Sequence, residues 1–455
     1  MATKRLNYFL METGLDKDSE PLTLKDDLEM LKHSGKESKE EVTEPENVIT
    51  GSASFVSTSL NLLKSIIGAG ILGIPLAIKR LGYVPGMLVM ILAASLSIFG
   101  LYLLSVIIER SGRSSTFSSA AMRYYPKGAV ALDLAIIIKC LGVGMSYVSV
   151  VGDVIPDIIR GFNPGLIERQ KWLQMKVIWV WLTILVMSPI VSMRKIDSLK
   201  YTSFFGMAAV VYLLGISIYQ MATVPELQRI DAFSPFTLTA FTSFSIFVFA
   251  FTCHQNIFPI QNEAKDHSAA GTLRVILLSV GLSLVTYSSF GIFSCAANAD
   301  IKDKILSSYP IDKLPFIFAR IWYAVLLAFS FPLQSYPTRA SLQKVASHAL
   351  GEERARGKSA VIYWTSTIFI LAVCGTVASL PVSLDTFLTI VGSTASPVIC
   401  YFLPALLYLK VTKDDDIKSR PNKVLRICAK VLLGCSIGII ILSSVIVVVK
   451  LSLRK

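Results

Sequence analysis

Charge is scarce in this chain of 455 residues, because Asp, Glu, Lys and Arg together make up only 16% of it. A typical soluble protein carries about 25%. Apolar residues make up 53%, and the mean hydropathy is +0.60. Eleven bilayer-spanning helices of about 20 residues each would account for most of them. The composition excludes a soluble enzyme, a disordered chain and a disulfide-rich secreted module, and it predicts an all-α polytopic membrane protein.

Metal-ligand, phosphate-binding and catalytic motifs are also missing. The seven cysteines are an odd number, nearly all lie inside apolar runs, and no CxxC or paired Cys/His spacing occurs. There is no P-loop, no HExxH and no GxSxG. We therefore expect no disulfide framework, no metal site, no cofactor and no enzymatic activity. The first apolar run starts only near Phe55, so no signal peptide is expected.

The net charge of +13 has two opposing parts. Residues 1–57 hold 7 Lys/Arg and 12 Asp/Glu, a net of −5, so the remaining residues carry +18. Basic residues concentrated in short loops between apolar runs are what the positive-inside rule predicts. No aromatic-studded basic groove suggests a nucleic-acid partner. We expect residues 1–56 to form a disordered acidic cytosolic tail that contains a short helix around residues 22–31 and is able to bind a cytosolic partner.

Eleven apolar segments follow the tail, most of them long enough to cross a bilayer. They lie at about 57–80, 84–108, 128–158, 172–193, 199–222, 236–260, 272–297, 316–338, 359–380, 384–409 and 424–449. Lys and Arg favour the loops after segments 2, 4, 6, 8 and 10, which predicts a cytosolic N-terminus. The longest basic loops, 339–358 and 410–426, would then face the cytosol.

Segments 1 and 6 differ from the others because residues that weaken a helix interrupt them. Segment 1 has glycines at 68, 70 and 73 followed by Pro75, and segment 6 has the polar run Thr252–Asn256 followed by Pro259. Broken helices at corresponding positions of two halves point to a transporter site. The second break comes five segments after the first. We therefore predict a five-plus-five inverted repeat, residues 57–222 and 236–409, with residues 424–449 as an eleventh helix.

Broken helices expose backbone groups that must line a polar cavity, since lipid cannot satisfy them. Half-helix N-termini suit a carboxylate and opposing carbonyls suit an ammonium group, so an amino-acid zwitterion fits both. The small residues Gly68, Ala69 and Gly70, with Ile67 before them, would let a substrate approach the backbone closely. Small residues also permit close helix packing on their own. The matching break in segment 6 favours the binding site.

Ionisable residues inside the apolar segments are candidates for ion coupling. Lys64 lies one turn before the glycines, where an ammonium group is costly and indicates function. His254 lies in the polar run of segment 6, either as a proton carrier or as a neutral imidazole bonded to a freed carbonyl. Lys139 and Arg320 lie nearer segment ends, where we expect their charges to reach the interface.

Segment 8 supplies two hydroxyl groups, those of Ser330 and Ser335. In a five-plus-five fold this segment runs beside segment 1, so the hydroxyls could ligate a sodium ion. Hydroxyls in apolar helices more often bond the carbonyl four residues earlier.

The chain resembles the amino acid/auxin permease family, especially its vacuolar amino acid transporters and its sodium-coupled neutral amino acid branch. The stretches that carry the resemblance are Asn61–Pro75 (NLLKSIIGAGILGIP), Gly142–Pro156 (GVGMSYVSVVGDVIP), Phe251–Glu263 (FTCHQNIFPIQNE), Phe331–Arg339 (FPLQSYPTR) and Ile390–Pro404 (IVGSTASPVICYFLP). They occur in the family's order and cover nearly the whole membrane region. The resemblance is specific for the family and says little about the substrate.

The resemblance implies eleven helices of the LeuT type that carry amino acids by alternating access. It places Gly68, Ala69 and Gly70 against the substrate backbone. Phe251, Cys253 and His254 would lie opposite, and Tyr147 and Ser149 would wall the site. The coupling-ion candidates are then Asn61, Lys64, His254, Ser330 and Ser335.

Lys64 stands where the sodium-coupled branch usually has Asn, and a fixed positive charge there disfavours bound sodium. We therefore expect an amino acid transporter coupled to protons, in the vacuolar or lysosomal membrane first and the plasma membrane second. A sodium-coupled carrier, or an amino-acid-sensing receptor with a signalling tail, are the alternatives.

Overall fold

A computed structural model describes residues 51–452, apart from residues 69, 194–199, 236, 299, 302–304 and 414–419. The described residues form helices and loops, with a single parallel bridge between Ala53 and Ala264. Nearly all of the predicted tail, residues 1–56, lies outside the described residues, as does the helix expected near residues 22–31.

The described elements follow the predicted segments closely. The first part of the chain forms α3 (Phe55–Ile66), α4 (Gly70–Leu81), α5 (Tyr83–Ser111), α6 (Phe117–Tyr124), η1 (Pro126–Gly128), α7 (Ala129–Phe162), α8 (Pro164–Arg169), η2 (Lys171–Gln174), α9 (Lys176–Val191) and α10 (Lys200–Thr223). The rest forms α11 (Leu238–Ala250), η4 (His254–Asn256), α12 (Ile257–Glu263), α13 (Ala269–Ala297), η5 (Ile305–Ser308), α14 (Leu314–Leu350), α15 (Glu352–Gly357), α16 (Ser359–Ser379), α17 (Leu384–Ser393), α18 (Ala395–Pro397), the π-helical turn η6 (Val398–Phe402), α19 (Leu403–Val411) and α20 (Arg420–Ser452).

Within the described residues, nine helices are long and apolar enough to cross a membrane. A tenth span results if α3 and α4, which are bent by 60° at their junction, count as one. The predicted segment at 172–193 differs, because its helix α9 has only 16 residues. At about 1.5 Å per residue such a helix is shorter than a hydrocarbon core of about 30 Å. Its first residues, Lys171–Gln174, form the separate turn η2 instead.

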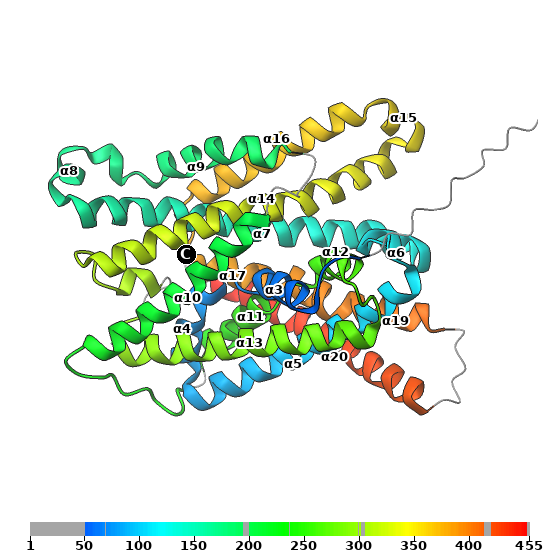
Figure 1. Ribbon diagram of the computed structural model, residues 1–455, viewed down its shortest axis with the longest axis horizontal. Helices are drawn as coiled ribbons and strands as arrows, with labels where there is room; N and C mark the ends of the chain where they lie inside the picture. The colour runs from blue at the N-terminus through cyan, green and yellow to red at the C-terminus, as the bar shows by residue number, and fades with distance from the viewer. Residues whose placement is uncertain are drawn as a thin grey trace, which may run out of the picture. The chain divides into compact units, whose positions relative to one another are not determined.

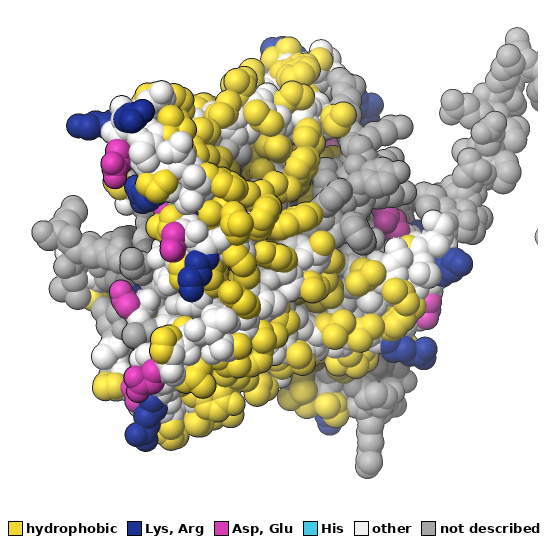
Figure 2. All heavy atoms as spheres, turned by 60° about the vertical axis from the view of Figure 1, so that its left-hand side comes forward, with side chains coloured by type: hydrophobic (Ala, Val, Ile, Leu, Met, Phe, Trp, Pro, Cys, Tyr) yellow, Lys and Arg dark blue, Asp and Glu magenta, His cyan; other side chains and the backbone are white. Residues whose placement is uncertain are grey.

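The long helices turn small residues inward and large apolar residues outward, as expected for protein packed within lipid. In α5, for example, Ala93, Ser97 and Gly100 are buried while Leu88 and Leu92 are exposed. Figure 2 shows the result on one face, where apolar side chains cover most of the surface and the charged ones gather towards its margins.

Helices with the same place in the two predicted halves pack against each other. The contacting pairs are α4 with α11, α5 with α13, α7 with α14, and α9 with α16. Figure 1 shows α7 and α14 running alongside each other over most of their length. Buried apolar side chains of α3, α4, α5, α7, α11, α13 and α14 take part in the main core, whereas those of α9 and α16 pack with α7 and α14 in a second, smaller cluster. The main core surrounds both helix breaks.

The predicted loop at 339–358 is wrong for most of its length. Helix α14 continues to Leu350 in spite of Pro332 and Pro337, and α15 follows it directly. Residues 339–350 consist mostly of good helix formers. Arg339 and Ser341 are buried, so this extension packs against the bundle rather than standing free in solvent.

Two charges expected to reach the interface are instead buried. Lys139 is 2% exposed, and Arg320 has no exposed surface. The Arg320 guanidinium donates to the carbonyls of the preceding loop, at 2.6 Å to Leu306 O, 2.9 Å to Tyr309 O and 3.0 Å to Pro310 O. A charge that finds several acceptors inside the protein has no need to reach water.

Candidate substrate site at the two helix breaks

The first break lies between α3 and α4. Helix α3 ends at Ile66, Ile67 is extended, and Gly70 begins α4. Gly73 and Pro75 lie inside α4 and Gly70 begins it, so of the four residues that predicted the break only Gly68 lies in the interruption. Gly73 serves packing, because an added Cβ would come within 2.6 Å of Leu388 Cδ1 in α17.

The second break follows α11. This helix ends at Ala250, and Phe251 caps it by donating its backbone N–H to Phe247 O. The chain then passes through the short turn η4 and resumes as α12, with Pro259 inside that helix. The Phe251 carbonyl, which the break frees from helical bonding, accepts a hydrogen bond of 2.9 Å from Ser97 Oγ in α5.

The two breaks meet. A Cβ added to Gly70 would lie 2.9 Å from Ala250 Cα, so only glycine allows this approach of α4 to the end of α11. The hydroxyl of Tyr287 in α13 lies 2.9 Å from Ile66 O and 3.1 Å from Ala250 O, the last carbonyls of α3 and α11. The tertiary structure thus brings the candidate residues Ile67, Gly68, Gly70 and Phe251 to the same meeting point. Ala69 lies outside the described residues.

Of the two predicted wall residues on α7, one faces the breaks. Tyr147 is buried, and a Cβ added to Gly68 would lie 2.6 Å from its hydroxyl oxygen. Ser149 points elsewhere, since its Oγ accepts a hydrogen bond of 2.7 Å from Lys176 Nζ at the start of α9. Lys176 also pairs with Asp153 at 3.3 Å. Successive residues of a helix point in different directions, so Tyr147 and Ser149 cannot both face one site easily.

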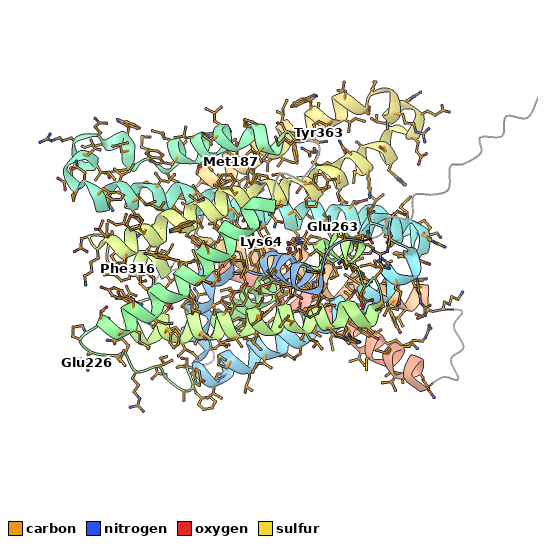
Figure 3. The ribbon with its side chains drawn as sticks, in the orientation of Figure 1. Lys64, Met187, Glu226, Glu263, Phe316 and Tyr363 are labelled. Atoms are coloured by element: carbon orange, nitrogen blue, oxygen red, sulfur yellow. The ribbon has the colours of Figure 1, made fainter. Side chains whose placement is uncertain are left out.

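Lys64 lies on α3 before the first break and packs against α10. A Cβ added to Gly206 of α10 would lie 3.5 Å from Lys64 Cε and 3.1 Å from Leu326 Cδ1 of α14. The lysine stem therefore passes where α3, α10 and α14 approach one another. Figure 3 labels Lys64 on α3. Asn61, one turn earlier on α3, accepts a hydrogen bond of 3.0 Å from Ser65 Oγ at its carbonyl.

The serine hydroxyls on α14 bond to their own helix. Ser330 Oγ donates to Leu326 O at 2.7 Å, and Ser335 Oγ donates to Phe331 O at 3.0 Å. This is the common arrangement for hydroxyls in apolar helices. Their oxygen lone pairs could still accept from a cation. Ser330 lies one turn along α14 from Leu326, which approaches Gly206 beside Lys64. Along this helix, Ser330 is therefore nearer to Lys64 than Ser335 is.

His254 and Cys253 are fully buried at the start of the resumed helix. The imidazole of His254 lies close to the backbone of Ser97, and neither ring nitrogen makes a well-aligned hydrogen bond within the described residues. A Cβ added to Gly100 of α5 would lie 2.8 Å from His254 Nε2, so the ring points at the α5 backbone. The buried Lys139 is close enough to act electrostatically on both His254 and Cys253. A buried imidazole with no well-aligned hydrogen bond beside a buried cation is uncommon.

The start of α3 is tied to the end of α12. Ala53 N donates to Glu263 O at 2.9 Å, and Lys265 N donates back to Ala53 O at 3.0 Å. Arg113 binds the same strand of chain through Asn262 O and Ala264 O, at 3.0 and 2.8 Å. The half-helices α3 and α12 are therefore joined at the ends that lie away from the breaks.

Two titratable groups follow this junction, between α12 and α13. Hydrogen bonds from the Ser268 hydroxyl and backbone N–H hold the pKa of Asp266 below its usual value. Burial, together with the nearby Arg113 charge, lowers the pKa of His267. Both shifts favour a charged Asp266 and a neutral His267 near neutral pH.

At the other end, α4 is tied to α17 by an ion pair. Arg80 Nη1 lies 2.6 Å from Asp385 Oδ1, and the Asp385 side chain is 2% exposed. Among the described residues, no group of three or more His, Cys, Asp or Glu side chains could hold a metal ion. The site offers backbone carbonyls, hydroxyls and half-helix ends.

The fold and the paired breaks define the class of the protein: a multi-pass helical membrane protein with the LeuT-type arrangement. The crystal structure of MhsT in complex with L-phenylalanine matches it with a TM-score of 0.52 and 14% sequence identity, over 86% of this chain and 99% of that chain. This likeness confirms the predicted fold and the two discontinuous helices.

The chain belongs to the family described as Transmembrane amino acid transporter protein, which matches residues 51–449. It is 32% identical over 379 residues to vacuolar amino acid transporter 5 of Schizosaccharomyces pombe, covering 80% of this chain and 86% of the relative. It is 31% identical to vacuolar amino acid transporter 6 of Saccharomyces cerevisiae, covering 65% and 67%. The predicted family is confirmed, and it is a family of transporters rather than enzymes.

Proposed function

We propose that this chain carries an amino acid across a vacuolar or related endomembrane by alternating access, coupled to protons. The observation that carries the proposal is the meeting of the two helix breaks, where the carbonyl ends of α3 and α11 converge on one point. Converging carbonyls suit an ammonium group, and the N-terminal ends of α4 and η4 suit a carboxylate. The membrane is inferred from relatives that are named as vacuolar transporters.

Two inverted repeats would make alternating access possible. We infer repeats at 57–222 and 236–409, with 424–449 outside them. The pairing of α4 with α11, α5 with α13, α7 with α14 and α9 with α16 supports a twofold relation between the repeats. In such folds one bundle rocks against the other around the site. The links of α3 to α12 and of α4 to α17 lie at opposite ends of the broken helices, where access would have to close.

Proton coupling is inferred from Lys64. Its stem lies between α3, α10 and α14, a place where an ammonium group would repel a bound sodium ion. A lysine surrounded by apolar helices loses hydration, and it can release and regain a proton as the surroundings change. His254, a fully buried imidazole at the second break, is the second candidate for carrying the proton.

Purified protein in liposomes tests the transport itself. With an imposed pH gradient, we expect at least one labelled amino acid from a panel of all side-chain classes to enter faster than in empty liposomes. Sodium gradients imposed separately should have no effect. If no amino acid moves under any gradient, transport is excluded. If a sodium gradient stimulates uptake and a pH gradient does not, the coupling ion is sodium rather than the proton.

Lys64→Asn tests the coupling. We expect this change to abolish or uncouple proton-driven flux, because it removes the ionisable group while keeping a polar side chain. Lys430→Asn is the matched control, since Lys430 is exposed on α20 and its loss changes the net charge equally. Uptake driven by a pH gradient is compared in the two variants. Full proton-driven flux in Lys64→Asn would contradict the assigned role.

A further inference from the structure

One hydroxyl group lies within hydrogen-bond distance of a carbonyl from each helix break. Tyr287 Oη lies 2.9 Å from Ile66 O and 3.1 Å from Ala250 O. Each carbonyl is the last of a half-helix, where the partial charge is negative, and among the described residues no backbone amide bonds to it. A phenol has a single proton, so it can donate fully to only one of the two carbonyls at a time. The two carbonyls could therefore accept more hydrogen bonds than the single proton of the Tyr287 hydroxyl can supply.

The surroundings of this hydroxyl are polar and uncharged. Tyr287 is fully buried, and the Phe251 ring packs edge-on against it with 5.3 Å between ring centroids. Tyr147 of α7 and Tyr323 of α14 are close enough to interact with it electrostatically. Tyr323 is also fully buried, and its hydroxyl has no hydrogen-bond partner among the described residues. Three tyrosines from three helices thus surround the meeting point of the breaks.

We propose that the Tyr287 hydroxyl stands in for the substrate's ammonium group while the carrier is empty. It satisfies the carbonyls of Ile66 and Ala250, so the empty carrier can close and return across the membrane. An incoming ammonium group has three N–H donors and can satisfy both carbonyls at once, and it takes the place of the hydroxyl. This inference rests on the proposed amino acid transport, and it assigns Tyr287 as a positioning residue for the empty state.

The proposal separates two steps of the transport cycle. The step with bound amino acid does not need the hydroxyl, because the ammonium group bonds the carbonyls. The return step without amino acid does need it, because a buried carbonyl left unpaired is costly. Removing the hydroxyl should therefore slow return of the empty carrier and strengthen amino acid binding.

Tyr287→Phe tests this by comparing net uptake with exchange. Liposomes without internal amino acid report net uptake, which needs the empty return, and liposomes filled with the same unlabelled amino acid report exchange. We expect the ratio of net uptake to exchange to fall about tenfold, and the apparent affinity for the amino acid to rise about three- to tenfold, the size of one hydrogen bond. Tyr309→Phe is the matched control, because Tyr309 is similarly buried and its hydroxyl bonds Ser294 Oγ away from the breaks.

Equal loss of net uptake and exchange in Tyr287→Phe, or no change in their ratio, would overturn the proposal. Weaker amino acid binding would do so too, because it would make Tyr287 a direct substrate ligand. All of these comparisons use wild-type protein that transports an amino acid. If the wild-type protein itself does not transport, the proposed function fails, which is a different outcome from failure of the Tyr287 proposal.

A measurement on the wild-type protein covers the case that Tyr287→Phe does not fold. Ethylamine and propionate, the amine and acid halves of alanine, are tested for competition against a labelled amino acid on purified protein. If the ammonium group displaces the hydroxyl, ethylamine competes and propionate does so much more weakly. Propionate competing as well as ethylamine would contradict the displacement.

Discussion

Single side chains decide the geometry of the breaks. Gly68 and Gly70 are glycines because other atoms occupy the space of a Cβ: the Tyr147 hydroxyl oxygen at 2.6 Å and the Ala250 Cα at 2.9 Å. The first obstacle is a hydroxyl at the end of a side chain, and the second is backbone. The two positions should therefore differ in whether a substitution can be rescued.

Gly68→Ala should lower stability by about 1–3 kcal/mol through overpacking against Tyr147. Adding Tyr147→Phe should restore most of this loss, because the next contact of the new Cβ is Tyr147 Cζ at an ordinary 3.5 Å. The unfolding temperature of the purified variants in detergent measures the effect. The same loss from Gly68→Ala with and without Tyr147→Phe would show that the hydroxyl is not the obstacle.

Arg320→Lys should also destabilise the protein, by about 2–4 kcal/mol, although the charge is kept. A lysine has three donors on one nitrogen and cannot reproduce the guanidinium fork that binds the carbonyls of Leu306, Tyr309 and Pro310. Thermal unfolding of this variant is compared with that of Arg354→Lys, an exposed arginine on α15. A similar, small change in both would contradict the structural role.

At the scale of elements, two links control how the broken helices sit in the bundle. The pair Arg80–Asp385 joins α4 to α17, and the backbone bonds of Ala53 join the start of α3 to the end of α12. Each link lies at the end of a half-helix remote from its break. Moving the far end of either half-helix away from its neighbour requires the corresponding link to open.

The coupling energy between Arg80 and Asp385 should be about 1–3 kcal/mol in a double-mutant cycle of Arg80→Gln and Asp385→Asn. Asp385 is nearly buried, and removing its charge leaves Arg80, whose side chain is 19% exposed, facing a neutral amide. Thermal unfolding of the wild type, both single variants and the double variant gives the cycle. Additive losses would show that α4 and α17 are not held together by this pair.

At the scale of the whole molecule, the long helices place successive loops at alternate ends. In Figure 1 the loop between α10 and α11 and the turn α8 lie at one end of these helices, and α6 and α15 lie at the other. Glu226, labelled in Figure 3, lies in that first loop. The positive-inside rule assigns the end with α15 to the cytosol.

Cysteines introduced at Glu226 and Gly357 should react with a membrane-impermeant maleimide from opposite sides of sealed vesicles. Both positions are exposed. Cys428 and Cys435, which are exposed on α20, are first replaced by alanine, while the five other cysteines are buried. We expect Gly357→Cys to react from the cytosolic side only and Glu226→Cys from the other side only. Reaction of both from one side would contradict the orientation.

Much of the fold could be predicted because apolar length alone marks a spanning helix. The segment boundaries agree with the helices within a few residues, except where α14 runs on to Leu350. That error arose because polar residues after Pro337 resemble a loop, whereas packing of Arg339 and Ser341 keeps them helical. The breaks were predicted from Gly68, Gly70, Gly73 and Pro75 and from the polar run at 252–256 with Pro259, and of these Gly73, Pro75 and Pro259 lie within helices.

The sequence by itself determined the class, the family and the two places where the helices break. These features depend on composition and on local backbone preference, which are set by residues close to one another in the chain. Only the tertiary structure decided which side chains meet there. Nothing in the sequence distinguishes Tyr287 from other tyrosines in apolar segments, and Lys139 and Arg320 carried the same local signal as charges that reach the interface. Burial and hydrogen bonding depend on neighbours distant in the chain. In this protein those neighbours place one hydroxyl between two carbonyls from different helices, and they give buried cations their surroundings.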